Sequence, residues 1–213
     1  MFKLEEIEDR VYHLSFNSQY DLAMHFLRLQ EFYESPSEDF RGKQFTILDY
    51  IEWYSKEHGN KFTYPYDWSG FNVPSSVVNK VYGTSGIQDI NKYDKFMSAM
   101  RDLIQTKCNS KYYLIGSRSG DIQTMDHEIA HAAWYLNNEY QQEQRENIKG
   151  LDPAMKEQMA KTLKGMGYHD EVIDDEIHAY MSTGLCQRLS KIKNVDKNRK
   201  SFINTFKNRK KGP

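Results

Sequence analysis

Residues 124–136 read TMDHEIAHAAWYL and predict a helix with the pentapeptide HEIAH at its centre. Its two histidines, His127 and His131, are four residues apart, which places them about 40° apart on one helix face. Both imidazoles can therefore reach a single metal ion. Glu128 follows the first histidine and can act as general base for a water molecule on that metal. The neighbouring positions are uncharged, as burial of this helix requires: Ile129, Ala130, Ala132 and Ala133.

An HExxH pattern arises by chance in roughly one or two sequences per hundred, so the motif alone does not establish a metal site. A third ligand from another part of the chain would support one. The stretch EVIDDEIHAYMSTGL predicts a helix whose apolar arc contains an ionisable side chain, Glu176. A lone carboxylate on a buried face is costly unless it is paired or bound to a metal. The alternative to a metal ligand is a buried pair with a lysine, an arginine or a tyrosine. The polar side chains expected on the opposite, water-facing arc are Asp174, Asp175, His178 and Ser182.

With HEIAH and EIHAY together, the chain resembles the gluzincin type of zinc metallopeptidase over about residues 111–185. In that group a glutamate on a second helix, often within an ExxA pattern, completes a His, His, Glu site. The resemblance implies that His127, His131 and Glu176 bind Zn²⁺. It also implies a zinc metalloendopeptidase, a hydrolase in which Glu128 activates a zinc-bound water for attack on a peptide bond.

The chain departs from the gluzincin pattern at Tyr180, where many members have an acidic residue four positions after the ligand glutamate. The group that orients the metal-bound histidines is therefore open, with Asp126 and Asp175 as candidates. The lethal-factor-like branch has a tyrosine shortly before its ligand glutamate. The resemblance thus implies that Tyr168 stabilises the oxyanion, with His169 as the alternative.

Two rival zinc patterns fit less well. The metzincin extension needs a glycine and then a histidine where this chain has Trp134 and Asn137. An aspartate as third ligand would be Asp175, but its helix phase points away from the apolar arc, so it ranks second.

The fold class predicted is α+β, mostly helical with a small sheet, with the HExxH helix packed against the helix that carries the glutamate ligand. Hydrophobic periodicity and turn residues define the elements. Strands are expected at 10–16 and 111–121, the second stopped by Gly116, and a short strand followed by an ordered loop at 60–76. Helices are expected at 21–35, 47–59, 91–107, 122–148, from Asp152-Pro153 to 165–169, and at 171–190.

Three regions follow, expected to form one compact unit. Residues 1–110 are a helical and aromatic region of unknown role, 111–190 the metallopeptidase-like region, and 191–213 a basic tail. The loop aromatics Tyr64, Tyr66, Trp68 and Phe71 could shape a pocket, although aromatics more often belong to a core.

Composition excludes several classes. With 29 basic and 30 acidic residues, no overall charge imbalance points to nucleic acid or a membrane. The N-terminus lacks the apolar core of a signal peptide, and no stretch approaches the ~20 apolar residues of a membrane span. The two cysteines, Cys108 and Cys186, form no CxxC pattern and favour free thiols and a cytoplasmic location.

A peptide or protein substrate is expected to add as a strand along an exposed edge at residues 111–116. The tail 191–213 has a helical apolar spacing and favours a docked terminal helix over one that binds nucleic acid or an anionic surface. Two other functions stay open: a non-catalytic zinc-containing binding or structural protein, and a nucleic-acid-associated factor that uses this tail.

Overall fold

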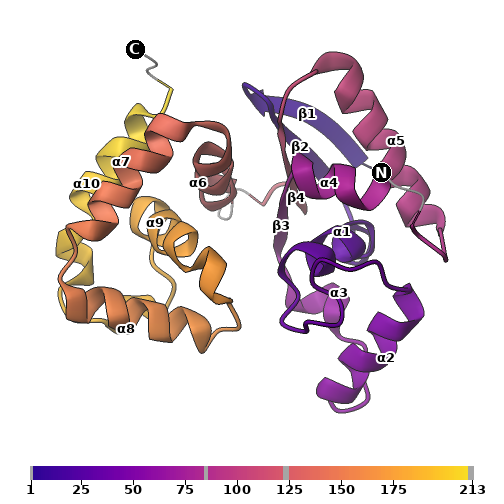
Figure 1. The fold of residues 1–213 in the computed structure, drawn as a ribbon, viewed down its shortest axis with the longest axis horizontal. Helices are drawn as coiled ribbons and strands as arrows, with labels where there is room; N and C mark the ends of the chain where they lie inside the picture. The colour runs from indigo at the N-terminus through magenta and orange to yellow at the C-terminus, as the bar shows by residue number, and fades with distance from the viewer. Residues whose placement is uncertain (1, 84–85, 122–124, 211–213) are drawn as a thin grey trace. The chain divides into compact units, whose positions relative to one another are not determined.

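The computed structural model describes residues 2–83, 86–121 and 125–210. The chain forms two compact units, Met1–Thr124 (unit 1) and Met125–Pro213 (unit 2), and each is treated by itself below. Their helices and one small sheet confirm the predicted α+β class (Figure 1). The functional assignment of the three predicted regions stays a prediction.

The sheet of unit 1 has four strands in the order β1-β2-β4-β3 (Figure 1). β1 (Phe2–Glu8) and β2 (Val11–Phe16) form an antiparallel hairpin, and β2 pairs in parallel with β4 (Tyr113–Arg118). β3 (Gly70–Pro74) closes the other side, antiparallel to β4. The sequence predicted β2 and β4 but not β1, whose run of glutamates interrupts the alternation expected of a strand.

β4 lies inside the sheet, and this overturns two expectations. Both of its edges are used in backbone pairing, by β2 and by β3, so the expected addition of a substrate strand at 111–116 is wrong. Gly116 does not end the strand but lies within it, where a Cβ atom would come 2.4 Å from the ring of Phe26. The glycine is required because this ring packs directly against the strand backbone.

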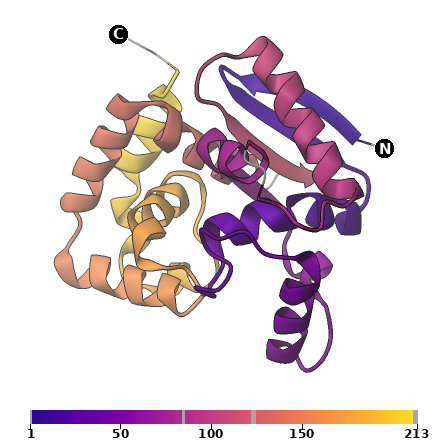
Figure 2. The same ribbon diagram turned by 45° about the vertical axis from the view of Figure 1, so that its right-hand side comes forward.

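Helices α1 (Gln19–Glu34) and α5 (Lys92–Lys107) match the predicted segments and cover the sheet. The ring of Phe96 on α5 packs against Phe2 and Phe16 of the first two strands, and Figure 2 shows α5 running alongside them. α2 (Ile47–Glu57) is also as predicted, and Gly59 beyond it adopts a positive φ.

The aromatic segment 60–76 has a different order from the predicted one. A short helix, α3 (Tyr64–Asp67), comes first, β3 follows it, and α4 (Ser75–Tyr82) begins where a loop was expected. Tyr64 and Phe71 are buried in the core, whereas Tyr66 and Trp68 are exposed. The tertiary contacts of the two buried rings therefore decide the path of this segment.

Unit 2 is a set of short helices, drawn in red, orange and yellow in Figure 1. They are α6 (Met125–Leu136), α7 (Asn138–Lys149), α8 (Pro153–Lys164), α9 (Ile173–Thr183) and α10 (Lys200–Asn208). Short 3₁₀ turns occur at Asp170–Val172, Leu189–Lys191 and Val195–Asn198.

Two helix lengths were predicted wrongly in unit 2. The single helix expected over 122–148 is two helices, because the Asn137 side chain accepts hydrogen bonds from the backbone N–H groups of Glu139 and Tyr140 and so starts α7 anew. The helix expected to reach residue 190 ends at Thr183, before Gly184. The predicted start at Asp152-Pro153 is confirmed, with Asp152 as the N-cap.

α9 is the central helix of unit 2, packed against α6, α7, α8 and α10. A helix with neighbours on several sides has no wide water-facing arc, so the expectation for three of its polar residues is wrong. His178 is fully buried, Ser182 is 5% exposed, and the side chain of Asp175 is 18% exposed. Asp174 does face solvent, where it pairs with Lys156.

The basic tail is partly a docked helix. Phe202 and Phe206 of α10 are buried, and α10 packs on α7 and α9. The buried amide of Gln144 donates to the backbone carbonyl of Phe202 and to the hydroxyl of Ser182. This is the docked arrangement that the tail sequence favours.

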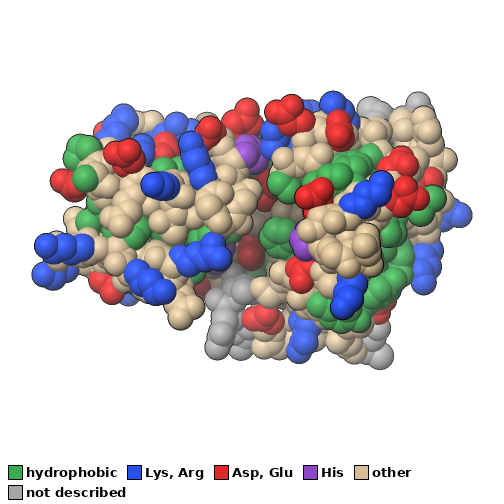
Figure 3. Space-filling model, turned by 90° about the horizontal axis from the view of Figure 1, so that it is seen from below, with side chains coloured by type: hydrophobic (Ala, Val, Ile, Leu, Met, Phe, Trp, Pro, Cys, Tyr) green, Lys and Arg blue, Asp and Glu red, His purple; other side chains and the backbone are tan. Residues whose placement is uncertain are grey.

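Several lysines of the tail remain exposed, namely Lys191, Lys193, Lys197, Lys200 and Lys207. On the face shown in Figure 3, Lys and Arg side chains occur singly among neutral and acidic groups rather than as one continuous patch. Over the described residues, no helix combines the length and apolar character needed to cross a membrane.

Candidate metal centre

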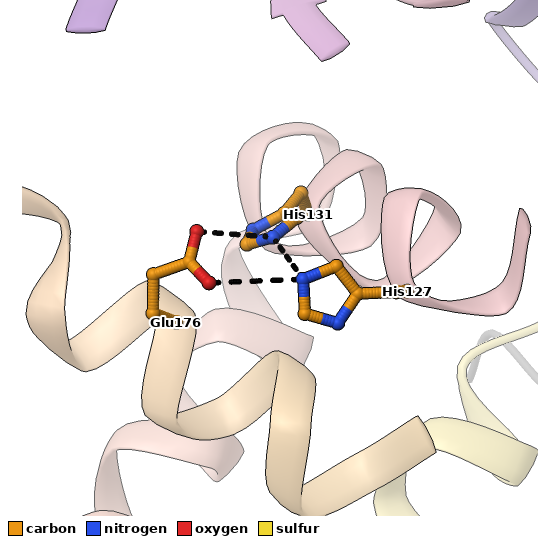
Figure 4. A group of neighbouring side chains, drawn as sticks. All are labelled: His127, His131 and Glu176. Carbon is orange, nitrogen blue, oxygen red and sulfur yellow. Dashed lines mark hydrogen bonds and ion pairs between the residues drawn. The ribbon is translucent and has the colours of Figure 1, made fainter. Parts of the chain in front are cut away.

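Three side chains from two helices converge in unit 2 (Figure 4). His127 and His131 project from α6, and Glu176 projects from the first turn of α9. The two Nε2 atoms are 3.2 Å apart, and the Glu176 carboxylate lies 3.7 Å from His127 Nε2 and 3.4 Å from His131 Nε2. These are the residues that the sequence proposed as ligands, and the fold brings one donor atom of each within 4.8 Å of the others.

The donor atoms are close enough together to surround one metal ion. Ligand atoms about 2.1 Å from zinc at tetrahedral angles lie about 3.4 Å from one another. The two Nε2 atoms, 3.2 Å apart, are close to that spacing. The distances of 3.4 and 3.7 Å join different oxygens of Glu176 to the two rings, and with one donor atom from each residue the three donors lie within 4.8 Å of one another. Two imidazoles and one carboxylate are a donor set typical of zinc sites that keep a fourth position for water or substrate.

Glu176 supplies an independent indication. Its side chain is 5% exposed, and its Oε2 atom is buried without a hydrogen-bond partner in the described part of the chain. Within the described residues, Glu176 forms ion pairs with His127 and His131. The alternative interpretation required a pair with a lysine, an arginine or a tyrosine instead. A buried carboxylate oxygen without a hydrogen bond is costly, and a bound cation removes that cost.

The close approach of α6 and α9 depends on small residues. Ala130 and Ala132 of α6 and Ala179 of α9 are fully buried. A methyl side chain lets two helix backbones come together at the shorter end of the usual 8–10 Å range. These small residues favour the packing of α6 on α9, which brings the two histidines near Glu176.

Asp175 lies behind one of the candidate ligands, His131. Its Oδ1 lies 2.9 Å from Nδ1 of His131, the ring nitrogen that faces away from the cluster. A carboxylate at Nδ1 holds the proton there and leaves Nε2 free for a metal. Asp175 is thus placed as the orienting group would be, whereas its place behind His131 does not suit the role of third ligand.

The cluster carries excess negative charge. Burial alone lowers the pKa of His131, but the carboxylates of Asp175, Glu176 and Glu128 outweigh it and raise that pKa well above its ordinary value. Burial likewise raises the pKa of Asp175, but His131 and His178 reverse this and hold it well below its usual range. The raised pKa of His131 favours its protonated form in the absence of a metal, and binding of a divalent cation would release that proton.

His178, expected from the sequence to face water, is buried next to this cluster. Its Nδ1 lies 3.1 Å from Oδ1 and 2.5 Å from the backbone carbonyl of Asp175, and its Nε2 lies 3.2 Å from the carbonyl of Ala130 on α6. The ring stacks on Trp134 with a centroid separation of 4.6 Å. The sequence offered one signal for this arrangement, the adjacency of Asp175 and Glu176. Two consecutive residues on a helix can contact different sides of one imidazole, here that of His131.

The predicted catalytic residues lie around this cluster. Glu128 is 7% exposed on α6, and its charge contributes to the raised pKa of His131. The ring of Tyr180 lies 4.6 Å from that of His127, and its hydroxyl is 3.4 Å from the hydroxyl of Tyr168. His169 precedes the 3₁₀ turn Asp170–Val172.

Comparison with known proteins adds no relative. No family model matches the chain, and neither do the curated protein sequences or the solved structures. The functional argument therefore depends on the residues and geometry of this chain.

Proposed function

We propose that this protein is a zinc-dependent metallopeptidase of the gluzincin type that hydrolyses peptide bonds. The observation that supports it best is the convergence of His127, His131 and Glu176, whose donor atoms lie within 4.8 Å of one another, with Glu128 next to the first of them on the same helix. An accidental HExxH pattern would not bring a buried carboxylate from another helix to the same point.

Each side chain has a role in the proposed hydrolysis. His127, His131 and Glu176 would hold Zn²⁺, which supplies Lewis-acid chemistry and lowers the pKa of water toward neutrality. Glu128 takes a proton from the attacking water and passes it to the leaving amine. An endopeptidase would place the substrate carbonyl between Glu128 and the tyrosines.

A neutral donor for the developing oxyanion comes from the tyrosine pair. Tyr168 keeps the role that the gluzincin resemblance implies, and Tyr180, whose hydroxyl is 3.4 Å away, links it to the ligand-bearing helix. Burial raises the pKa of Tyr180 to about 12, so its hydroxyl stays protonated at neutral pH. A protonated phenol can donate a hydrogen bond to an oxyanion.

The alternatives are weaker. A non-catalytic zinc protein has no need for the glutamate of HExxH, and Glu128 is present. A nucleic-acid-associated factor would use the basic tail, but α10 of that tail is docked on α7 and α9 through Phe202 and Phe206. Cys108 and Cys186 are both free thiols, which suits the proposed cytoplasmic location.

Zinc content and peptidase activity test the proposal in two steps. We expect about one zinc per wild-type chain by mass spectrometry, and a sharp loss in Glu176→Ala but not in Glu171→Ala, a neighbouring exposed glutamate. Screening of a peptide library should then show cleavage that Glu128→Gln abolishes while it retains zinc. Wild-type protein without zinc after zinc is supplied, or cleavage unaffected by Glu128→Gln, would refute the function.

A further inference from the structure

The contacts behind His131 form a chain of buried groups that extends from the metal ligands into the core of unit 2. Oδ1 of Asp175 lies 2.9 Å from Nδ1 of His131 and 3.1 Å from Nδ1 of His178. One carboxylate oxygen is therefore shared by two imidazole rings. The second ring, that of His178, has no solvent exposure.

The His178 ring is held on several sides. It stacks on Trp134 at 4.6 Å and meets the edge of Tyr140 at 5.7 Å between ring centroids. Whichever ring nitrogen carries the proton has an oxygen to donate to, on Asp175 of α9 or at the Ala130 carbonyl of α6. The ring is thus anchored to the same helix that carries both histidine ligands.

We propose that Asp175 and His178 form a positioning pair that fixes the ring of His131 for metal binding. Asp175 accepts the Nδ1–H of His131, which leaves Nε2 directed at the metal, and His178, whose ring stacks on Trp134 of α6, donates its own Nδ1–H to the Asp175 carboxylate. Asp175 stands just before the ligand glutamate. It supplies the carboxylate that many gluzincins have four positions after that glutamate, where this chain has Tyr180. This inference rests on the metal site of the proposed function.

Asp175 couples the position of α9 to the orientation of the His131 ring. Asp175 and Glu176 are consecutive on α9, so one helix supplies both a ligand and the group that orients another ligand. A displacement of α9 relative to α6 would alter both contacts of His131 together. Metal affinity should therefore respond to His178, although this ring is not among the ligands.

The experiment measures zinc affinity of the full chain by competition with a fluorescent zinc chelator. We expect Asp175→Asn to weaken zinc binding about 10–100-fold and His178→Phe, which keeps the stack on Trp134 but loses the polar contacts, to weaken it about tenfold. The matched control is Asp174→Asn, which removes the same charge from the adjacent, solvent-facing position and should bind zinc like the wild type.

Two spectroscopic measurements separate positioning from a general loss of structure. The visible absorption of the cobalt-substituted protein should change in Asp175→Asn but not in Asp174→Asn. In the zinc-loaded wild type, ¹⁵N-histidine spectra should show His131 protonated at Nδ1, a result that does not depend on the folding of any variant.

The outcomes distinguish this inference from the proposed function. Wild-type protein that binds no zinc overturns both. If wild-type protein binds zinc but Asp175→Asn binds it as tightly as Asp174→Asn, or His131 lacks the Nδ1 proton, the metal site stands and the positioning pair is refuted.

Discussion

Glu31 in unit 1 should make the stability of that unit strongly dependent on pH. This side chain of α1 is 2% exposed. Burial raises its pKa from 4.5 to about 7, although the hydroxyls of Ser35, Tyr50 and Tyr64 oppose the rise. A carboxyl that is ionised in the unfolded chain but protonated in the folded one binds a proton on folding.

The direction and size of the effect follow from that difference. Below pH 4.5 both states are protonated and Glu31 has no effect; between pH 4.5 and about 7 the folded state holds one more proton, so stability falls as pH rises. Above pH 7 the loss is complete. At 1.36 kcal/mol per pKa unit, a rise of about 2.5 units corresponds to roughly 3 kcal/mol.

Urea unfolding of wild type and Glu31→Gln across pH 4.5–8, followed by circular dichroism, measures this difference. The glutamine variant should gain about 3 kcal/mol over the wild type between the two ends of the range, because an amide does not ionise. Glu38→Gln, an exposed glutamate on the segment after α1, serves as the control and should show no such gain. A difference between Glu31→Gln and wild type that stays constant with pH would refute the reasoning.

Three further changes test the packing and the metal centre. Gly116→Ala should lower the free energy of unfolding, measured in urea, by about 1–3 kcal/mol, because its Cβ would meet the Phe26 ring. Adding Phe26→Leu to this variant should restore part of the loss. An unchanged unfolding midpoint in Gly116→Ala would contradict the close approach. Arg28→Ala should lower the free energy of unfolding by about 3–5 kcal/mol in the same assay. It leaves the buried Asp94 carboxylate without the guanidinium that binds it at 2.8 and 3.1 Å. A loss below about 1 kcal/mol, the range of an exposed ion pair, would be inconsistent with this reasoning. Zinc at 100 times its Kd should stabilise unit 2 by about 2.7 kcal/mol, seen as a higher thermal midpoint that EDTA and His131→Ala each abolish; equal midpoints with zinc and with EDTA would exclude a folded-state site.

Most regular elements could be predicted because their signals are local. The helical periodicity of α1 and α5 and the N-cap at Asp152 depend on neighbouring residues and were confirmed. The errors arose where a distant contact or a capping side chain decides the outcome. Gly116 is a strand residue because Phe26 packs on it, and Asn137 divides a continuous apolar pattern by capping α7.

For the candidate site, the sequence by itself identified the three candidate ligands that the structure brings together. The spacing of HEIAH places two imidazoles on one helix face, and Glu176 stands out as a charge on an apolar arc, because both properties follow from helix periodicity alone. Only the tertiary structure decided what surrounds those ligands. The arc of α9 that carries Asp175 and His178 was expected to face water but is largely covered, because other helices pack on several sides of α9. The hydrophobic periodicity of a helix does not reveal how many other helices pack against it.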